Sequence, residues 1–246
     1  MRKLTPLVVI GMFFLTLPAV AQGQQGLGFP DGFSGQTSGL IIQLFGLLTV
    51  LAVAPGLLIM VTSFTRFVIV FSILRAGIGL QTTPANLVLV SLALFMTFYV
   101  MSPVFDRAWR DGVQPLLSQE IDESQAFTRI TQPFREFMLE NVREQDLELF
   151  ADLARERGQD VVTDETIDIR IVVPAFMISE IRRGFEIGFL VVLPLLVIDL
   201  VVATIVMAMG MMMLPPSVVS LPFKILFFVM IDGWNVLVGS MVRSVS

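Results

Sequence analysis

The sequence contains no cysteine and no histidine among its 246 residues. Without cysteine the chain can form no disulfide, no thiolate metal site and no thiol nucleophile. Without histidine it lacks the side chain that most often acts as an acid or base near neutral pH. Charged residues are also scarce, at 15%. The net charge of −5 does not indicate the basic surface that binds nucleic acid. We therefore expect neither group-transfer chemistry nor a cofactor, a metal or a nucleic-acid partner.

Apolar residues are abundant, at 55% of the chain. Four stretches approach the ~20 residues that a helix needs to cross ~30 Å of hydrocarbon. They are residues 40–61, 87–105, 185–207 and 218–242. We predict an all-α membrane or envelope protein in which two apolar helical hairpins flank a soluble, mainly helical acidic insert.

Two further apolar stretches are too short to cross a bilayer alone. Residues 67–74 are predicted to extend the first hairpin, which covers residues 40–105. Residues 171–178 contain Pro174 and are predicted to form a re-entrant or interfacial piece. Residues 171–178 and the second hairpin with its methionine-proline loop make up the C-terminal region, residues 171–246.

The N-terminus is typical of an export signal. Two cations precede an apolar stretch, residues 4–17, and the small-residue cleavage site Ala19-Val20-Ala21 follows. We predict a signal peptide of residues 1–21, cleaved after Ala21, and a flexible leader, residues 22–39. A retained anchor helix is the alternative, and Pro18 argues against it. The signal indicates a protein of the bacterial inner membrane or envelope whose mature N-terminus lies outside the cytoplasm.

This orientation places the insert, residues 106–170, on the extracytoplasmic (periplasmic) side. Arg66 and Arg75 then lie inside, in agreement with the positive-inside rule. Three other cations disagree with it, because the same orientation leaves them outside: Arg182, Arg183 and Arg243. We give the signal more weight than these three charges.

The insert differs in composition from the rest of the chain. It carries sixteen acidic residues and eight arginines, which is 24 of the 37 charged residues. Residues 133–157 show helical spacing of apolar side chains, and Gly158 ends this pattern. The apolar face is either a small local core or a docking face. A segment of ~65 residues buries little surface alone, so both remain open.

Three ionisable residues interrupt the last apolar hairpin: Asp199, Lys224 and Asp232. Charges at membrane depth cost about 2.5–3.5 kcal/mol on insertion scales, so each needs a partner or water. Asp199 and Lys224 lie at similar distances from the turn of the hairpin, on opposite arms. We expect them to form intramembrane polar contacts, such as a pair across the hairpin. A proton relay is the alternative.

The turn of this hairpin is rich in methionine. The five methionines are Met207, Met209, Met211, Met212 and Met213. Methionine side chains are flexible and repack against changing neighbours. Gly210 loosens the backbone, and Pro215 and Pro216 end the helix. One copy of this loop fills a gap in a core, whereas several copies around an axis form a soft gasket. Thioether ligation of copper(I) is a further alternative.

Motifs along most of the chain resemble the FliP family of the flagellar type III export gate and its counterparts in virulence injectisomes. They are Thr62-Ser63-Phe64-Thr65-Arg66, Leu74-Arg75, Pro84, Asn86, Met101-Ser102-Pro103, Pro174-Ala175-Phe176, Ser179-Glu180, Phe185-Glu186-Ile187-Gly188-Phe189, Ile198-Asp199, the methionine-proline stretch, Ser220-Leu221-Pro222-Phe223-Lys224 and Asp232-Gly233-Trp234. Their length and number make the resemblance specific.

The resemblance implies a non-enzymatic role in the inner membrane, at the flagellar basal body. Several copies, a pentamer in this family, are expected to assemble with FliQ, FliR and other export apparatus proteins into a gate for unfolded flagellar proteins. It also implies that the methionine stretch is the pore gasket. Subunit contacts of the family fall at positions that match Phe137, Phe150 and Glu180.

Two other functions remain open beside a pore-forming subunit. One is a proton- or ion-coupled transporter that uses the ionisable residues of the last hairpin. The other is an assembly scaffold that nucleates the gate without lining its pore. Ion flux through the isolated protein would favour the first, and normal closure after methionine replacement would favour the second.

Overall fold

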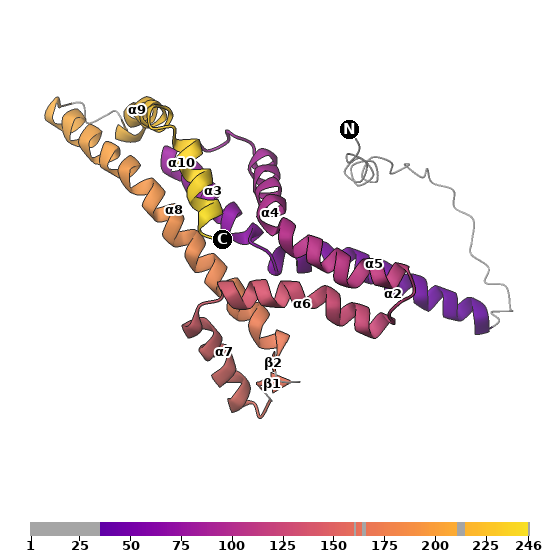
Figure 1. Ribbon diagram of the computed structural model, residues 1–246. Helices are drawn as coiled ribbons and strands as arrows, with labels where there is room; N and C mark the ends of the chain where they lie inside the picture. The colour runs from indigo at the N-terminus through magenta and orange to yellow at the C-terminus, as the bar shows by residue number, and fades with distance from the viewer. Residues whose placement is uncertain (1–34, 160, 164–165, 211–214, 246) are drawn as a thin grey trace, which may run out of the picture. The chain divides into compact units, whose positions relative to one another are not determined.

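The chain folds into helices, as the computed structural model shows (Figure 1). The structure describes residues 35–159, 161–163, 166–210 and 215–245. The predicted signal peptide with its cleavage site at Ala21, and residues 22–34 of the predicted leader, lie outside these residues, whereas residues 35–39 are helical. The prediction of a mainly helical protein is confirmed, and the exception among the described residues is one short two-stranded sheet.

The elements follow one another without a repeated motif. In chain order they are α2 (Gly35–Met60), α3 (Phe64–Ile78), α4 (Asn86–Ala108), the π-helical turn η1 (Trp109–Val113), α5 (Gln114–Leu117), α6 (Glu123–Asn141), α7 (Glu144–Glu156), β1 (Val162–Thr163), β2 (Thr166–Ile167), α8 (Ile169–Ala208), α9 (Pro216–Met230) and α10 (Gly233–Arg243). The two strands pair antiparallel, with Val162 opposite Ile167.

Helices α3 and α8 pack closely against each other. Gly184 and Gly188 lie one turn apart on α8, and both are buried. A Cβ atom on Gly188 would lie 2.7 Å from Ile73 Cδ1, and one on Gly184 would lie 3.3 Å from the carbonyl oxygen of Arg66. Small residues at this spacing let two helix backbones approach. The core lies around this contact, with Phe67, Phe71 and Phe176 fully buried.

The predicted helical region over residues 133–157 is divided between two helices. Helix α6 ends at Asn141, and α7 begins at Glu144. Val142 and Arg143 between them are extended. The Arg143 N–H donates to Ser179 Oγ of α8, at 3.0 Å. This tertiary hydrogen bond satisfies a backbone group that a continuous helix would satisfy internally.

Helix α6 begins at a capping aspartate. The Asp122 side chain accepts a hydrogen bond from the Gln125 N–H at 2.7 Å, and this contact holds the pKa of Asp122 below its usual range. A lowered pKa means that the cap stabilises the helix at neutral pH, and that the contribution is lost as the pH falls through the lowered pKa.

Residues 171–178, which the sequence predicts to be a re-entrant or interfacial piece, are not separated from the helix that follows them. They belong to α8, a continuous helix of 40 residues that contains both Pro174 and Pro194. Pro174 lies near the start of the helix, where Ile171, Val172 and Phe176 around it are buried. Packing therefore holds the helical conformation despite the missing N–H donor of the proline.

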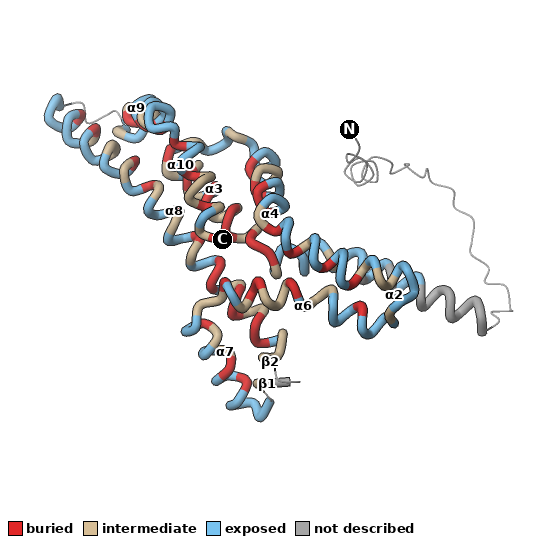
Figure 2. Tube along the Cα trace, viewed as in Figure 1, coloured by how far each residue is buried: buried red, intermediate tan, exposed pale blue. Residues whose placement is uncertain are grey.

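Helices long and apolar enough to cross a membrane are present. Among the residues that the structure describes, two meet this description, residues 86–117 and Ile169–Ala208, and up to four do so if each bent helix pair is counted as one span. The second bent pair, α9 and α10, turns by 64° at its break. Figure 2 shows that much of the surface of α8 beyond the insert is exposed. These helices fit a membrane protein.

Candidate functional site at the turn between α8 and α9

The turn after α8 is built by glycine and proline. Helix α8 ends at Ala208, and Gly210 follows with a φ of +74°, a left-handed conformation that glycine adopts without strain. On the other side, Pro215 precedes α9 and Pro216 is its first residue, where the absent N–H costs nothing. The sequence predicts that Pro215 and Pro216 end the preceding helix, whereas in the structure α8 already ends at Ala208 and the two prolines stand at the start of α9.

The methionines next to this turn are exposed in the single chain. Met207 is 59% and Met209 is 58% accessible to solvent. Met211, Met212 and Met213 lie outside the described residues. An apolar groove of 510 Å³ runs between α8 and α9 up to Met209, with Val202, Val206 and Phe223 in its lining. The end of this hairpin is thus an apolar surface that no other described part of the chain covers.

Directly behind the turn, a polar cluster joins three helices. Lys224 Nζ of α9 lies 2.5 Å from Asp199 Oδ2 of α8. Ser220 Oγ donates to Asp199 Oδ1 at 2.5 Å, and Lys224 Nζ donates to the carbonyl oxygen of Gly77 at 2.9 Å. The structure therefore brings together Asp199 and Lys224, which the sequence places at similar distances from the turn.

Each member of this cluster has a physical reason to be there. The Gly77 carbonyl is among the last four of α3 and has no acceptor role within its own helix. A cation at a helix C-terminus also interacts favourably with the helix dipole. The Lys224 side chain is only 6% exposed, so its charge needs the carboxylate of Asp199. The cluster fixes the position of the turn relative to α3.

Asp232 does not belong to this cluster. It is exposed at the break between α9 and α10, with a φ of 51°. Its carboxylate accepts a hydrogen bond from Asn235 Nδ2 at 3.1 Å. No contact with Asp199 or Lys224 is present among the described residues. Sequence reasoning grouped Asp232 with them but missed Ser220, whose spacing of four from Lys224 places both on one face of α9.

A second polar cluster, fully buried, lies where α3, α8 and the C-terminal residues meet. Arg66 Nε donates to Glu180 Oε2 at 2.9 Å, and Arg66 Nη2 contacts Glu180 Oε1. Arg66 Nη1 donates to the carbonyl oxygen of Ser244 at 2.7 Å and to its Oγ at 3.0 Å. The side chains of Arg66 and Glu180 are 0% exposed.

Glu180 and Phe137 are therefore placed inside the chain, where the sequence-based expectation had them at a subunit contact. Phe137 is 6% exposed, and its ring packs edge-on against that of Phe176, with centroids 5.8 Å apart. A buried aromatic residue and a buried ion pair stabilise the fold of one chain and leave no side-chain surface for a second. At Phe137 the apolar face of the insert is a local core.

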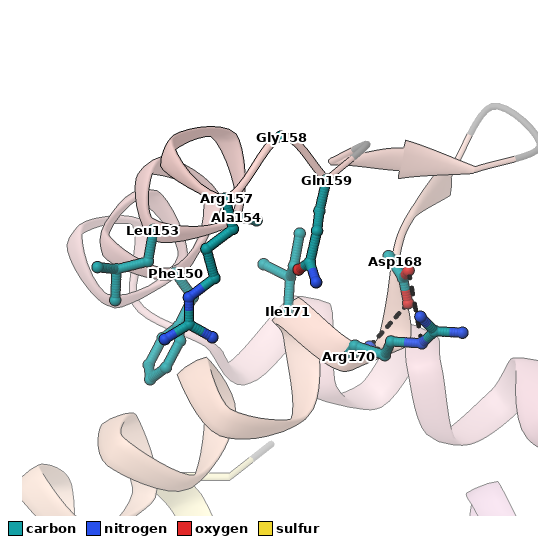
Figure 3. Close-up of a pocket in the computed structure, with 9 residues that line it drawn as sticks. All are labelled: Phe150, Leu153, Ala154, Arg157, Gly158, Gln159, Asp168, Arg170 and Ile171. Atoms are coloured by element: carbon teal, nitrogen blue, oxygen red, sulfur yellow. Dashed lines mark hydrogen bonds and ion pairs between the residues drawn. The ribbon is translucent and has the colours of Figure 1, made fainter.

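Phe150 differs, because it lines a surface pocket. This pocket, of 490 Å³, lies between the C-terminal part of α7 and the start of α8. Figure 3 shows Phe150, Leu153 and Arg157 on one side and Gln159 and Ile171 across from them, while Arg170 lies further along, beside Asp168. Unlike Phe137, Phe150 is thus only partly buried in the single chain.

No group of three or more acidic, histidine or cysteine side chains that could hold a metal occurs in the part of the chain that the structure describes. The ionisable groups of both clusters are instead paired with each other, as in contacts that hold helices together. The site is an apolar, methionine-bearing turn held in place by a polar cluster.

Comparison with known proteins gives a consistent result. A model of the FliP family matches residues 47–241. A protein of Rhizobium meliloti, the flagellar biosynthetic protein FliP, is 72% identical over 210 residues, which cover 85% of this chain and 86% of that protein. The protein of the same name from Agrobacterium fabrum is 68% identical over 235 residues, covering 94% and 95%. That of Bacillus subtilis is 46% identical over 203 residues, covering 82% and 91%.

Proposed function

This chain belongs to the FliP family and is thus a component of the flagellar export apparatus, and from this premise we propose that it is the core pore-forming subunit of the type III export gate. In this proposal unfolded flagellar proteins pass through the gate, and the turn between α8 and α9 seals it. The matched family is not a catalytic one.

The exposed methionines at the end of α8 carry the proposal. A single chain leaves Met207 and Met209 more than half exposed beside an apolar groove. If several copies were arranged around an axis, their turns would lie next to one another and form an apolar constriction. Such constrictions close by dewetting, without a rigid plug. Flexible methionine side chains suit a seal that must yield to a polypeptide.

The absence of cysteine offers a direct experiment, because an introduced cysteine is the only thiol in the chain. We expect Met209→Cys to be cross-linked to the same residue of a second copy and to a cysteine in an export substrate stalled in the gate. Leu117→Cys, which is also exposed, at 71%, but lies at the end of α5, is the matched control. Equal cross-linking of substrate at both positions, or none at Met209→Cys in assembled gates, would contradict a pore-lining turn.

Assembly is proposed to be homo-oligomeric, a pentamer by analogy with the family, together with FliQ and FliR. Among the residues expected at the subunit contact, Phe150 is the one whose side chain is partly exposed. The insert would lie on the periplasmic side of the inner membrane, as the predicted signal peptide implies.

The two phenylalanines of the insert should respond differently to the same substitution. Phe150→Asp is expected to reduce the amount of assembled complex while the single chain still accumulates. Phe137→Asp buries a charge beside Phe176 and should reduce the amount of the chain itself. Native gels and immunoblots of the same membranes separate the two effects. Loss of the single chain in both variants would show that Phe150 also belongs to the local core.

Ion-coupled transport is the second candidate, because the carboxylate of Asp199 is 33% exposed within an apolar helix. The pairing with Lys224 and Ser220 favours a structural role, since a relay needs a carboxylate that is free to exchange protons. A subunit that only scaffolds assembly differs from a pore subunit and from a transporter, because the gate would then close without the methionines.

Asp199→Asn separates the structural role from the relay. Asparagine keeps the shape, but its single carbonyl oxygen can take the place of only one of the two carboxylate oxygens that Ser220 and Lys224 contact, so we expect a less stable gate with partial export. Asp152→Asn, at an exposed ion pair with Arg155, is the control and should leave export unchanged. Export is measured as flagellin released into the medium. Complete loss of export by gates of normal composition would favour the relay.

A further inference from the structure

A single buried hydroxyl group connects α8 with the first turn of α7. Ser179 of α8 is 0% exposed, and its Oγ accepts a hydrogen bond from the Arg143 N–H at 3.0 Å. The same Oγ lies 2.7 Å from Asp146 Oδ2 and 2.9 Å from the carbonyl oxygen of Ala175 in its own helix. A hydroxyl has one proton to donate, and an ionised carboxylate is the stronger acceptor. The Ser179 hydroxyl therefore joins the Arg143 N–H to the Asp146 carboxylate.

The two residues that it joins are those of a capping box. Arg143 is the N-cap of α7, with extended backbone angles, and Asp146 is the third helical residue. In a capping box the side chain at that third position, usually glutamate or glutamine, accepts a hydrogen bond from the N–H of the N-cap. Aspartate is one methylene shorter than glutamate. Here Ser179 stands between the two groups, so a residue of another helix completes the box.

Burial of apolar side chains holds α7 only weakly. Of its thirteen residues, those that are buried are Asp146, Ala151 and Ala154. Leu149 and Leu153 are 50% and 38% exposed. The hydrophobic contribution grows with the area buried, and alanine offers little of it. The polar contacts at the start of α7 therefore contribute a large share of its attachment to α8.

Helix α7 is also separated from its neighbours in the chain. Val142 and Arg143 before it are extended, and Gly158 after it has a φ of +67°. Its direction is therefore not set by the continuation of another helix. Helix α7 packs mainly against α8, beside which it lies (Figure 1). Contacts with α8 thus decide where α7 lies.

The position of α7 in turn decides where Phe150 lies. Phe150 follows Asp146 by four residues, so both are on the same face of α7. It lines the pocket between α7 and the start of α8. On the other side of the connection, Glu180 follows Ser179 directly and pairs with Arg66 of α3. Two consecutive residues of α8 thus link α7 and α3 to the same helix.

We propose that Ser179 is a positioning residue, whose hydroxyl caps α7 from the neighbouring helix and thereby holds Phe150 in place for assembly. This inference rests on the proposed role of Phe150 in the subunit contact. Without the hydroxyl, the Arg143 N–H loses its acceptor and the Asp146 carboxylate loses its donor. Helix α7 then separates from α8, while the pair of Arg66 and Glu180 still holds α8 to α3.

The first test is hydrogen exchange of the full-length chain in detergent, followed by mass spectrometry. Ser179→Ala should speed exchange of the α7 amides about tenfold, as expected for the loss of one buried hydrogen bond. The amides of α6 should keep their rates, whereas a general loss of stability would speed exchange in both helices. Equal acceleration in α6 and α7, or none in α7, would overturn the proposal.

A matched control removes another buried hydroxyl. The Thr97 hydroxyl donates to the carbonyl oxygen of Ala93 at 2.7 Å, within its own helix α4. Thr97→Val keeps the shape of this side chain and removes the hydrogen bond, so exchange in α7 should not change. Acceleration in α7 as large as that of Ser179→Ala would count against a specific role of Ser179.

Asp146→Glu gives an independent variant. With Ser179 present, the added methylene crowds the buried hydroxyl, so this change alone should also speed exchange in α7. Combined with Ser179→Ala, the glutamate can accept the Arg143 N–H directly and complete the capping box within α7. The double variant should therefore exchange more slowly in α7 than either single variant. Exchange as fast as in the single variants would refute the cap.

Assembly is measured separately, on native gels of the same membranes. Ser179→Ala should reduce the assembled complex while the chain accumulates, as expected for Phe150→Asp, and the double variant should restore it. If Phe150→Asp reduces assembly and Ser179→Ala does not, Ser179 does not position Phe150. If Phe150→Asp itself leaves assembly unchanged, the proposed subunit contact is wrong, and the exchange rates alone decide whether Ser179 caps α7.

Discussion

Cells that carry Met209, Met211 and Met212 replaced together by alanine are expected to leak small ions through gates that still assemble. Alanine removes most of the side-chain volume at three positions of every copy, so the constriction becomes wider and wettable. Met209 is exposed at the end of α8, whereas Met211 and Met212 lie outside the described residues. Assembly should persist, because the cluster of Asp199, Ser220 and Lys224 that positions the turn is untouched.

Leucine at the same three positions is the matched control. It keeps the volume and the apolar character, so the gate should stay closed, although the stiffer branched side chain is expected to slow export. Ion leak is measured across the membranes of cells that express each variant together with the partner subunits, and the assembled complex is quantified in the same cells. Tight membranes in the alanine variant, with assembly confirmed, would mean that these methionines are ordinary core and that the seal lies elsewhere.

Glu180→Ala is expected to prevent the chain from accumulating. It leaves the Arg66 guanidinium charged at a site with 0% exposure, and breaking a buried pair in this way costs about 3–5 kcal/mol. That is a large share of the roughly 5–15 kcal/mol that stabilises a folded domain. The same change frees α8 from α3 and from the C-terminal residues that Arg66 also binds.

The chain provides its own control for this effect. Arg107 and Glu136 form an ion pair of 2.7 Å on the surface, with side chains 45% and 40% exposed. Glu136→Ala should cost less than about 1 kcal/mol, as for other surface pairs. Arg66→Met with Glu180→Leu removes both charges and should recover much of the stability lost by Glu180→Ala. The stability of the three variants is compared by their protein levels in membranes and by thermal unfolding in detergent. Normal accumulation of Glu180→Ala would refute a structural role for the pair of Arg66 and Glu180.

Local chemistry allowed the turn between α8 and α9 to be predicted from the sequence. Glycine and proline act on their own backbone, so Gly210, Pro215 and Pro216 indicate helix ends without knowledge of the fold. The pairing of Asp199 with Lys224 follows from the same turn, because a hairpin brings together residues at similar distances from its tip. Long apolar stretches likewise predicted the helices.

Contacts between distant segments could not be predicted in this way. Arg66 and Glu180 are 114 residues apart, and no local pattern shows that they meet. The break between α6 and α7 lacks glycine and proline, and a hydrogen bond from Arg143 to Ser179 accompanies it. Pro174 suggested a re-entrant or interfacial piece, but the segment is part of α8, in which the neighbours of Pro174 are buried. The position of Phe137 inside the chain depends in the same way on Phe176, in another helix.

The length of α8 has a mechanical consequence. At ~1.5 Å per residue its 40 residues span about 60 Å, roughly twice the hydrocarbon thickness of a bilayer. Helix α8 begins at Ile169 in the insert, Ser179 and Glu180 anchor it about three turns further on, and the other end carries the methionine turn. The part beyond Glu180 measures about 42 Å, so a tilt of about 5° at the anchor displaces the far end by about 4 Å. If several copies of α8 surrounded one pore, a small tilt of each helix would move its methionine turn outward and widen the opening between the turns.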